Sequence, residues 1–594
     1  MQDFVLDQSI QQWVVIAVLL AVIVGLYFER WKPPVVFIAG VFLLLVLKVI
    51  TPQDFLDSFS NQQIISIFLL MFITSAINDN FNITFWFDKY FSKSKSPQQF
   101  LGRLTFSVAS LSSFMNNTPI VSLMIPYVRG WAKENGVSPS KLLIPLSYAA
   151  SLGGMITVIG TSTNLVLNGF LEEEGLVVLG FYDFLPLGLL VTVVGCAYLM
   201  TLGYTILPDR LAPIQDFSRD DRQYLVETVV LGDSPFAGKT IIEAELRNLK
   251  EVYLAQLVRG DKVIAPVPPD AKIRVGDHLF FAGVTDKVVD FVKNRRGIKL
   301  ISDKKNFDLG TQLNIVEAIV PANSSLAGRT VKEYGFRQAF DAAIIGIHRN
   351  GEKIFGKIGN VTLQNGDLLL MLVGKQFYKN SHKDKNLYVV SNIDKIDGDN
   401  PFNKRSFLFI LALVFGLLFF NVFSLFMSLL VIVMALMALK LLPMQQVRRG
   451  TNFGLFVVLA SALTLGKTLI DTGTAQLLAD GFLGPFVPYG KLATLIGIFS
   501  LTLFLTSFIT NVAAVSIAFP IIYALVQEQG LEGTPYYLTI AFAASASFLT
   551  PISYQTNLMV YGPGSYTFND FLKVGAPLTF LYAITVLVYV YWMY

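Results

Sequence analysis

At residues 112–119 the chain reads Ser-Ser-Phe-Met-Asn-Asn-Thr-Pro, a run of hydroxyl and amide side chains in an otherwise apolar region. Thr163-Asn164 comes next, and the second half of the chain carries Thr510-Asn511 followed by Thr556-Asn557. The two asparagines of each half are 47 positions apart in the first half and 46 in the second. Such matched polar spacing in two apolar halves indicates an internal structural repeat.

The composition places these motifs in a membrane. Of the 594 residues, 53% are hydrophobic and 15% are charged, whereas a soluble domain carries about 25% charged residues. Long apolar runs occur at both ends: Trp13–Phe28, Val35–Ile50, Phe184–Ile206, Phe407–Met427 and Phe580–Trp592. Residues 1–12 lack Lys and Arg, so we expect the first run to be kept as a helix and not removed as a signal peptide.

The same composition argues against several kinds of chemistry. A net charge of +4, spread thinly, makes nucleic acid an unsuitable partner. Cys196 is the single cysteine and lies in an apolar run, so no intrachain disulfide is possible. All three histidines, His278, His348 and His382, fall in the polar middle, which excludes a histidine-ligated metal centre in the membrane part. We predict no cofactor, no transition metal and no enzymatic activity.

Hydropathy divides the chain into a membrane half, a soluble block and a second membrane half. The predicted domains are residues 1–208, 209–300, 301–400 and 401–594. The two middle domains follow from a repeat at an offset of 90 residues, in which six features recur: Val226-Glu227, Ala237-Gly238, Thr240, Arg247, Arg259 and Gly276-Asp277. We expect each unit to contain a strand, a turn near Gly238, a short helix from Thr240 and further strands, including 252–258, 279–282 and 368–373.

The repeated unit resembles the TrkA-C regulatory domain in its Gly-x-Thr run, its two arginines and its closing Gly-Asp-x-Leu turn. The resemblance covers about 70 residues of each copy and implies small α+β modules that pair with one another. In some proteins such modules bind a small regulatory ligand. The Gly-Lys-Thr at 238–240 is not a phosphate-binding loop, because Asp233 stands where that loop requires a glycine.

Charges around the polar motifs predict that the two membrane halves are inverted. Basic residues flank the stretch 104–128 on both sides, which predicts a re-entrant hairpin open to the cytoplasm. The second half has no Lys or Arg between 492 and 572, and Glu528 and Glu532 flank its hairpin. One hairpin is therefore expected to open inward and the other outward.

The polar motifs combine neutral oxygen ligands with helix breakers and contain no Asp, Glu, Lys or Arg. Inside a bilayer, irregular backbone and polar side chains are tolerated where they line a cavity. Amide, hydroxyl and freed carbonyl oxygens suit Na⁺, whereas a proton-driven carrier would normally place a carboxylate or histidine there. Helix N-termini at such breaks favour an anion. The alternative is that these side chains only join helices to one another.

At these residues the chain resembles the divalent anion:sodium symporter family, which includes dicarboxylate, citrate and sulfate carriers. The resemblance covers nearly all of both membrane halves. It implies a polytopic α-helical membrane protein, two inverted repeats with re-entrant hairpins, a homodimer in the lipid bilayer and elevator-type alternating access. The soluble α+β insertion of two TrkA-C domains would then lie in the cytoplasm, beneath the cell membrane.

The family's functional residues can be carried over by position. One sodium site would use Ser112, Asn117 and the backbone around Gly160, and the other Thr506, Asn511 and the backbone near Ser553. Substrate-binding residues would be Asn116, Asn117, Thr118, Thr161, Ser162, Thr510, Asn511, Tyr554 and Gln555. Supporting residues would be Thr163, Asn164, Thr556 and Asn557.

Departures from the family pattern bear on the substrate. Val512 stands where a hydroxyl is expected, and the expected Pro-Pro pairs are Ser162-Thr163 and Gln555-Thr556. Extra hydroxyl and amide donors favour a compact tetrahedral oxyanion. With the TrkA-C modules, these motifs resemble the sulfate-transporter-like branch of the family. We predict sodium-coupled transport of sulfate, with a di- or tricarboxylate as the alternative.

Two other functions fit the sequence less well. A TrkA-C-regulated channel would need a selectivity filter such as Thr-Val-Gly-Tyr-Gly, which the sequence lacks. A cation/proton antiporter would need an acidic cluster within the membrane. Lys467 and Asp471 are four positions apart and could form such a relay, although an interfacial pair is the more ordinary interpretation.

Overall fold

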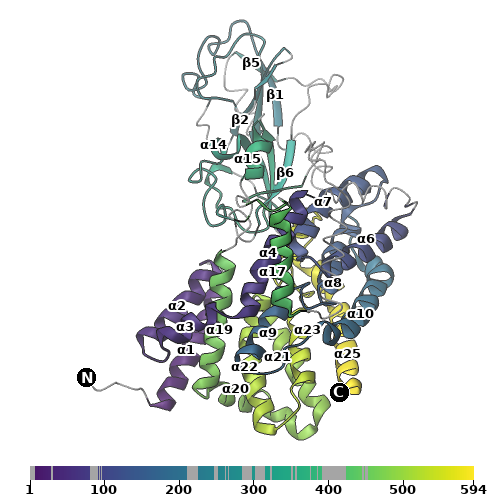
Figure 1. Ribbon diagram of the computed structural model, residues 1–594. Coiled ribbons are helices and arrows are strands. Elements are labelled where there is room, and N and C mark those ends of the chain that lie inside the picture. The colour runs from purple at the N-terminus through teal and green to yellow at the C-terminus, as the bar shows by residue number, and fades with distance from the viewer. Residues whose placement is uncertain are drawn as a thin grey trace.

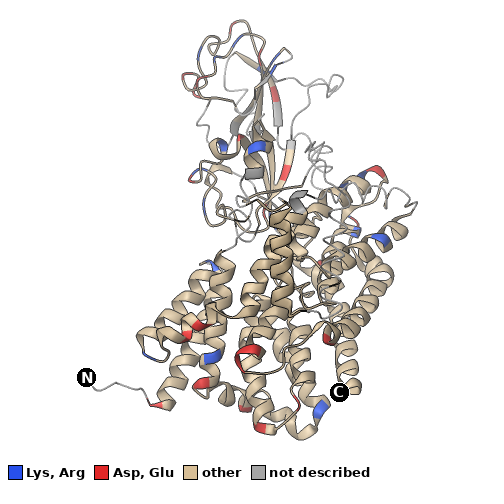
Figure 2. Cartoon of the chain, viewed as in Figure 1, with Lys and Arg blue, Asp and Glu red and all other residues tan. Residues whose placement is uncertain are grey.

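The computed structural model describes residues 7–27, 31–80, 91, 94, 96–210, 225–246, 252–260, 262–264, 267–283, 297–300, 315–321, 324–349, 352–354, 358–374, 376–383, 386–390, 416, 423–439, 441–443, 447 and 453–594. Two β-sheets stand on one end of a large helical part (Figure 1). Charged residues are sparse through the middle of the helical part (Figure 2).

The helices before the sheets are α1 (Gln8–Tyr27), α2 (Pro33–Val46), α3 (Pro52–Phe59), α4 (Gln62–Asn80), α6 (Pro97–Ser112), α7 (Asn117–Glu134), η1 (Pro139–Lys141), α8 (Leu143–Gly154), α9 (Ser162–Glu173), α10 (Phe181–Tyr198), the π-helix η2 (Leu199–Gly203) and α11 (Tyr204–Ile206). After the sheets come α17 (Leu425–Ala438), α19 (Phe453–Asp471), α20 (Thr474–Phe482), η5 (Gly484–Tyr489), α21 (Lys491–Phe508), α22 (Asn511–Gln529), α23 (Thr534–Ala544), α24 (Gln555–Tyr561) and α25 (Phe568–Met593).

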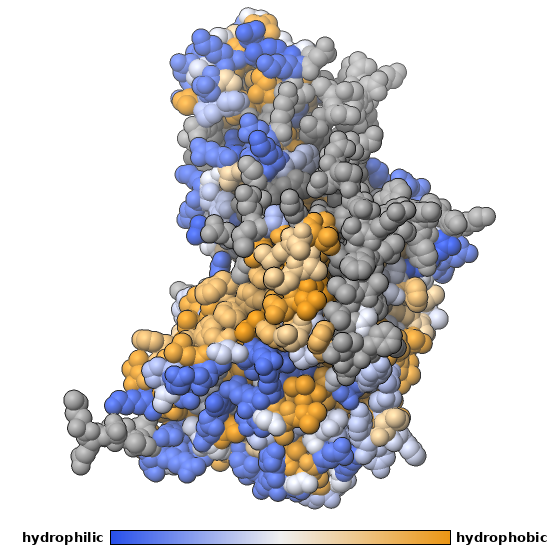
Figure 3. Space-filling model, in the orientation of Figure 1, coloured by the Kyte–Doolittle hydropathy of each residue, from blue (hydrophilic) through white to orange (hydrophobic). Residues whose placement is uncertain are grey.

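Within the described residues, six helices are long and apolar enough to cross a membrane: α1, the run from α10 to α11, α19, α21, α22 and α25. The bent pair of α3 and α4 raises the number to seven. Large apolar side chains such as Trp13 and Phe580 are exposed on these helices. Figure 3 shows an apolar band across the helical part next to the sheets, with hydrophilic areas further from them, while the described surface of the sheets is mainly hydrophilic. This distribution fits a multi-pass membrane protein.

Four of the five predicted apolar runs match described helices. The exception is 407–427, which lies mostly outside the described residues, although α17 begins at Leu425. The helix predicted to reach Ile50 ends earlier, at Val46, and Lys48 adopts a left-handed backbone with φ of 57°. A chain that turns at Lys48 cannot continue the helix, since that conformation is incompatible with helical geometry.

The soluble block contains two five-stranded antiparallel sheets of identical order. The first sheet has the order β3 (Lys262–Ile264), β2 (Val252–Arg259), β4 (His278–Gly283), β1 (Leu225–Val230) and β5 (Ile298–Leu300). The second has β10 (Tyr388–Val389), β6 (Ile315–Ile319), β9 (Leu368–Val373), β7 (Ala342–Arg349) and β8 (Glu352–Ile354), which is the same order read from the other edge.

The 90-residue repeat extends to individual contacts. Arg259 pairs with Asp277 at 2.7 Å, and Arg349 pairs with Asp367 at 2.7 Å. Burial raises the pKa of the Asp367 carboxyl above its ordinary value, and the hydrogen bond from Arg349 acts in the opposite direction. The sequence repeat therefore corresponds to two copies of one fold, which we call the first and second modules.

The short helix predicted from Thr240 is wrong in its starting point. Residues 241–245 form turns, and Glu245 has a φ of 54°. In the second module the helix is α14 (Phe336–Phe340), which begins six positions after Thr330. The first module's counterpart lies largely outside the described residues. The predicted strands 252–258, 279–282 and 368–373 agree with β2, β4 and β9.

Two helical hairpins carry the polar motifs. The first is α6 and α7, which extends from Pro97 to Glu134 and is longer than the predicted stretch 104–128. Near the end of α7, Arg129 forms a buried ion pair with Glu317 of the second sheet. The second hairpin is α21 and α22, and Glu528 near its end accepts a hydrogen bond from Gln476 of α20, at the end of the helical part remote from the sheets (Figure 1). The two hairpins thus open toward opposite ends of the helical part.

Tyr566 joins the two halves near the sheets, and its loss should destabilise the fold. Its buried hydroxyl donates to the Ser140 carbonyl at 2.6 Å and accepts from the Ile144 amide at 3.0 Å. Tyr566→Phe should lower the free energy of unfolding by about 1–3 kcal/mol, because two buried backbone groups lose their partner. Thermal unfolding of the purified protein measures this. The control Tyr489→Phe, at an 82% exposed position, should change little; equal melting temperatures for the two variants would contradict the prediction.

Candidate functional site

The tip of the first hairpin brings three oxygen atoms together. The Ser112 hydroxyl is in hydrogen-bond contact with the Asn117 side-chain oxygen and lies 2.7 Å from the Ala150 carbonyl oxygen. Ser112 and Asn117 are both buried. A hydroxyl has one hydrogen to donate, so it cannot satisfy both acceptors at once. The result is a compact, neutral cluster with more acceptor oxygens than donated hydrogens.

The tip of the second hairpin repeats this cluster. The Thr506 hydroxyl lies 2.9 Å from the Asn511 side-chain oxygen and 2.7 Å from the Ala544 carbonyl oxygen. The sequence separations are 5 and 38 residues, the same as in the first cluster. Ser547 adds a hydroxyl that donates to the Asn511 oxygen at 2.8 Å. We call these the first and second oxygen clusters.

Helix breaks face each hairpin tip. Between α8 and α9 the chain is irregular from Met155 to Thr161, and the Asn164 amide holds this break by donating to the Thr157 carbonyl at 3.1 Å. Between α23 and α24, the Asn557 amide donates to the Ser547 carbonyl at 2.7 Å and to the Thr550 carbonyl at 3.2 Å. Each asparagine supplies donors to carbonyls that a continuous helix would have satisfied.

Glycines allow the first break to approach the first oxygen cluster. A Cβ at Gly160 would lie 2.5 Å from the Gly154 carbonyl oxygen and 2.8 Å from the Ser112 carbonyl oxygen. A Cβ at Gly154 would lie 3.1 Å from the Asn117 amide nitrogen. Only hydrogen fits at Gly160, which places backbone oxygens beside Ser112 and Asn117. The structure thus brings together the three residues predicted for the first sodium site.

The two halves meet through side chains predicted to bind substrate. The Asn117 amide donates to the Tyr554 hydroxyl at 2.8 Å, and Tyr554 also shares a hydrogen bond with Thr161. The Thr118 hydroxyl is 3.4 Å from the Gln555 side-chain oxygen. Residues from the first hairpin, the first break and the second break therefore converge on one region.

The other predicted residues occupy less central places. Asn116 and Thr510 are exposed, and each caps the N-terminus of the helix that follows. Ser162 is half-buried at the start of α9. The Ser553 hydroxyl turns to its own loop, where it donates to the Thr550 carbonyl at 2.9 Å. The geometry is therefore compatible with a role for the backbone near Ser553 in the second sodium site, but not with a role for the Ser553 hydroxyl.

The supporting residues lie in the interior. Thr163 is buried and 3.3 Å from the Thr161 hydroxyl. The Ser147 hydroxyl, which the sequence did not single out, lies 2.8 Å from the Thr556 hydroxyl and 2.7 Å from the Asn557 side-chain oxygen. Ser547 was also missed. Ser547 lies 36 positions after Asn511, and the position 36 after Asn117 in the first half is Gly153, which has no hydroxyl. A comparison of the two halves therefore does not reveal Ser547.

Comparison with known proteins bears on the function of this arrangement of side chains. A family model described as citrate transporter matches residues 23–536 and 490–594. The chain belongs to the citrate transporter family. It is 33% identical to a Chlamydomonas reinhardtii protein named "Putative sulfur deprivation response regulator", over 91% of this chain and 95% of that protein. It is 30% identical to an uncharacterized transporter of Synechocystis, over 90% of each chain. Sodium/sulfate cotransporter 2 of C. reinhardtii is 22% identical, over 89% of this chain and 83% of that protein.

Membership of the citrate transporter family places the chain in a family of transporters. The long apolar helices of the described residues agree with a multi-pass membrane protein. The family model does not address the TrkA-C resemblance, which stays a prediction for the two modules.

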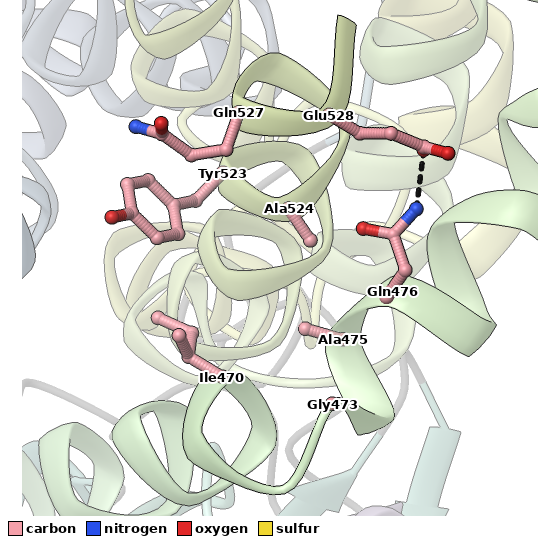
Figure 4. Close-up of a pocket in the computed structure, with 8 residues that line it drawn as sticks. All are labelled: Ile470, Gly473, Ala475, Gln476, Tyr523, Ala524, Gln527 and Glu528. Atoms are coloured by element: carbon pink, nitrogen blue, oxygen red, sulfur yellow. Dashed lines mark hydrogen bonds between the residues drawn. The ribbon is translucent and has the colours of Figure 1, made fainter.

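Lys467, which the sequence offered as half of a proton relay with Asp471, is placed by the structure in an ion pair. Lys467 of α19 lies 3.6 Å from Glu173 at the end of α9, so its partner in the structure belongs to another helix. A cavity of about 390 Å³ is lined by α19, α20 and α22, with Tyr523, Gln527 and Glu528 on one side and Gln476 on the other (Figure 4). None of the residues that line it belongs to the predicted site. The cavity lies at the end of α22 opposite to Asn511.

Gly160→Ala should disturb the first break, because the added methyl group meets two carbonyl oxygens at less than 3 Å. We expect it to lower the free energy of unfolding by about 1–3 kcal/mol, as overpacking does. Thermal unfolding measures the change. Gly130→Ala is the matched control, since an added Cβ there meets nothing within 4 Å and alanine favours a helix. A melting temperature for Gly160→Ala equal to that of Gly130→Ala would refute the close approach.

Proposed function

We propose that the protein is a sodium-coupled secondary active transporter of a small divalent anion, with sulfate as the substrate. The observation that carries the proposal is the pair of matching oxygen clusters, Ser112 with Asn117 and Thr506 with Asn511. Each one gathers neutral oxygen atoms in a buried setting, and oxygen atoms are the ligands that a hard cation prefers.

Sodium is the cation that this chemistry favours. The segments that form the clusters contain no carboxylate, thiolate or imidazole, so divalent transition metals lack their preferred ligands. A proton has no titratable group to occupy. The first site would use Ser112, Asn117 and the backbone at Gly160; the second would use Thr506, Asn511 and the backbone near Ser553.

An anion between the two sites would rely on helix N-termini. Helices α7, α9, α22 and α24 begin at Asn117, Ser162, Asn511 and Gln555, so four helix N-termini lie at the polar motifs. No basic side chain lies in these segments. The positive helix ends and the bound sodium ions together would offset the charge of the substrate.

Two sets of observations bear on whether the substrate is sulfate or a carboxylate. Some relatives are named sodium/sulfate cotransporters. Thr118, Tyr554 and Gln555, which lie at the contact between the halves, carry hydroxyl and amide groups of the kind that donate to a compact oxyanion. The family model is described as citrate transporter, which favours a di- or tricarboxylate as the second candidate. Val512, beside Asn511, lacks a hydroxyl that a second carboxylate could use.

The remaining predictions belong to the same proposal. The two membrane halves would be inverted repeats, supported by hairpins that open toward opposite ends, and would work by elevator-type movement in a homodimer. The two modules would be cytoplasmic TrkA-C domains that serve regulation or dimerisation, with a small regulatory ligand as one means. Their shared fold and the 90-residue repeat support the resemblance.

Uptake in proteoliposomes tests the function. Labelled sulfate uptake should require an inward Na⁺ gradient and fall by about 5- to 150-fold when K⁺ replaces Na⁺, because coupling free energies are commonly of that size. Unlabelled succinate and citrate should compete poorly. Equal uptake in K⁺ would refute sodium coupling, and strong competition by citrate would favour the carboxylate candidate.

Removal of one cluster hydroxyl should weaken sodium binding. Ser112→Ala and Thr506→Val should each raise the sodium concentration for half-maximal uptake by about tenfold, the effect of losing one good polar ligand. Neighbouring hydroxyls provide controls: Ser107 and Ser507 donate to carbonyls of their own helices, at 2.6 Å and 2.7 Å. Ser107→Ala and Ser507→Ala should leave the sodium dependence unchanged. A cluster variant with wild-type dependence would remove that residue from the site.

A further inference from the structure

The second module is packed into the helical part where β6 ends and β9 begins, two neighbouring strands inside its sheet. We call Glu317, Ile319, Gly366, Leu368 and Val390 the docking surface. Ile319, Leu368 and Val390 belong to the same buried apolar cluster as the helices, whereas the interior of the module forms a cluster of its own. The module is therefore held by packing in addition to its covalent connections.

A polar contact attaches the docking surface to α7. Glu317 forms an ion pair with Arg129, and the two side chains are only 0% and 9% exposed. Arg129 follows Asn117 on the same helix by twelve positions. A buried ion pair is stable only while both charges stay together, because either one alone loses its compensation.

An apolar contact attaches the docking surface to α24. A Cβ at Gly366 would lie 2.7 Å from the Leu558 side chain, and a Cβ at Gly562 would lie 3.0 Å from the Cβ of Leu368. The second module and α24 are thus in close contact: Gly562 lies against Leu368, and Gly366 lies against the flexible Leu558 side chain. Leu558 follows Tyr554 by four positions, which is about one helical turn.

The docking surface therefore bridges two helices that also touch across the candidate site. Asn117 precedes Arg129 on α7, Tyr554 precedes Leu558 beside α24, and Asn117 and Tyr554 are hydrogen-bonded at 2.8 Å. We propose that the second module is a latch, which holds α7 against α24 and so keeps the site closed toward the modules. This inference rests on the proposed transport function and assigns the regulatory role to one module and one surface.

The described residues of the first module show no equivalent attachment. Glu227, the counterpart of Glu317, pairs with His278 of its own sheet at 2.6 Å. A Cβ at Gly276, the counterpart of Gly366, would meet nothing within 4 Å, and the adjacent Val275 is 55% exposed. Among the described residues, the latch contacts thus belong to the second module, and the first module offers matched controls.

A reversible crosslink tests the latch. In a Cys196→Ser background, Leu368→Cys with Gly562→Cys should form a disulfide after a small adjustment, since disulfides need about 3.5–4.5 Å between Cβ atoms. Oxidation should reduce sulfate uptake about tenfold or more, and dithiothreitol should restore it; the two single-cysteine variants should not respond. Failure of the crosslink to form, or unchanged uptake when it has formed, would overturn the latch.

Release of the latch should have the opposite effect. Glu317→Gln should raise the initial uptake rate about twofold to thirtyfold, the range for residues that couple distant elements, whereas Glu227→Gln should not. Arg129→Glu combined with Glu317→Arg should restore the wild-type rate. Glu317→Gln should also lower the crosslinking yield of the cysteine pair, a readout independent of transport. Absence of sulfate or carboxylate uptake by the unlinked protein would refute the proposed function, while an unchanged yield would refute the latch.

Discussion

A hydroxyl group donates one hydrogen, and at each hairpin tip one hydroxyl lies between two acceptor oxygens. Ser112 faces Asn117 and Ala150, and Thr506 faces Asn511 and Ala544. In the second cluster Ser547 also donates to the Asn511 oxygen, whereas in the first cluster the two acceptors share one hydroxyl hydrogen. A buried acceptor without a donor is unfavourable in an apolar setting unless a cation takes the donor's place. The surrounding architecture serves to hold these oxygens in place: hairpin tips, helix breaks and glycine contacts all meet there.

The helix breaks create a similar need for hydrogen-bond donors. Breaking a helix inside a bilayer frees backbone carbonyls that water cannot reach. Asn164 and Asn557 resolve this by donating their side-chain amides across the breaks. Their buried positions explain why the matched Thr-Asn pairs are so prominent in the sequence. They stabilise the irregular segments, whereas Asn117, Tyr554, Thr118 and Gln555 provide the contact between the halves.

The two modules have the same fold but differ in the partners of equivalent side chains. Both carry the same strand order and the same Arg–Asp pair. Their differences lie at the docking surface of the second module. Glu317 finds Arg129 of the helical part, while Glu227 finds His278 within its own sheet. A few side chains at this surface therefore decide whether a module joins the helices, although its core is unchanged.

Much of the design could be predicted from the sequence, because hydropathy, spacing and repeated motifs are local properties. They determined the membrane halves, the sheet-containing block with its 90-residue repeat, the hairpins and the residues that converge on the site. The sequence could not indicate Ser547 or Ser147, nor that Ser553 turns toward its own loop. It also gave no sign that Lys467 pairs with Glu173 or that Arg129 pairs with Glu317. Only the tertiary structure decided these, because such contacts join positions tens to hundreds of residues apart, and no local pattern specifies which distant partner a side chain will meet.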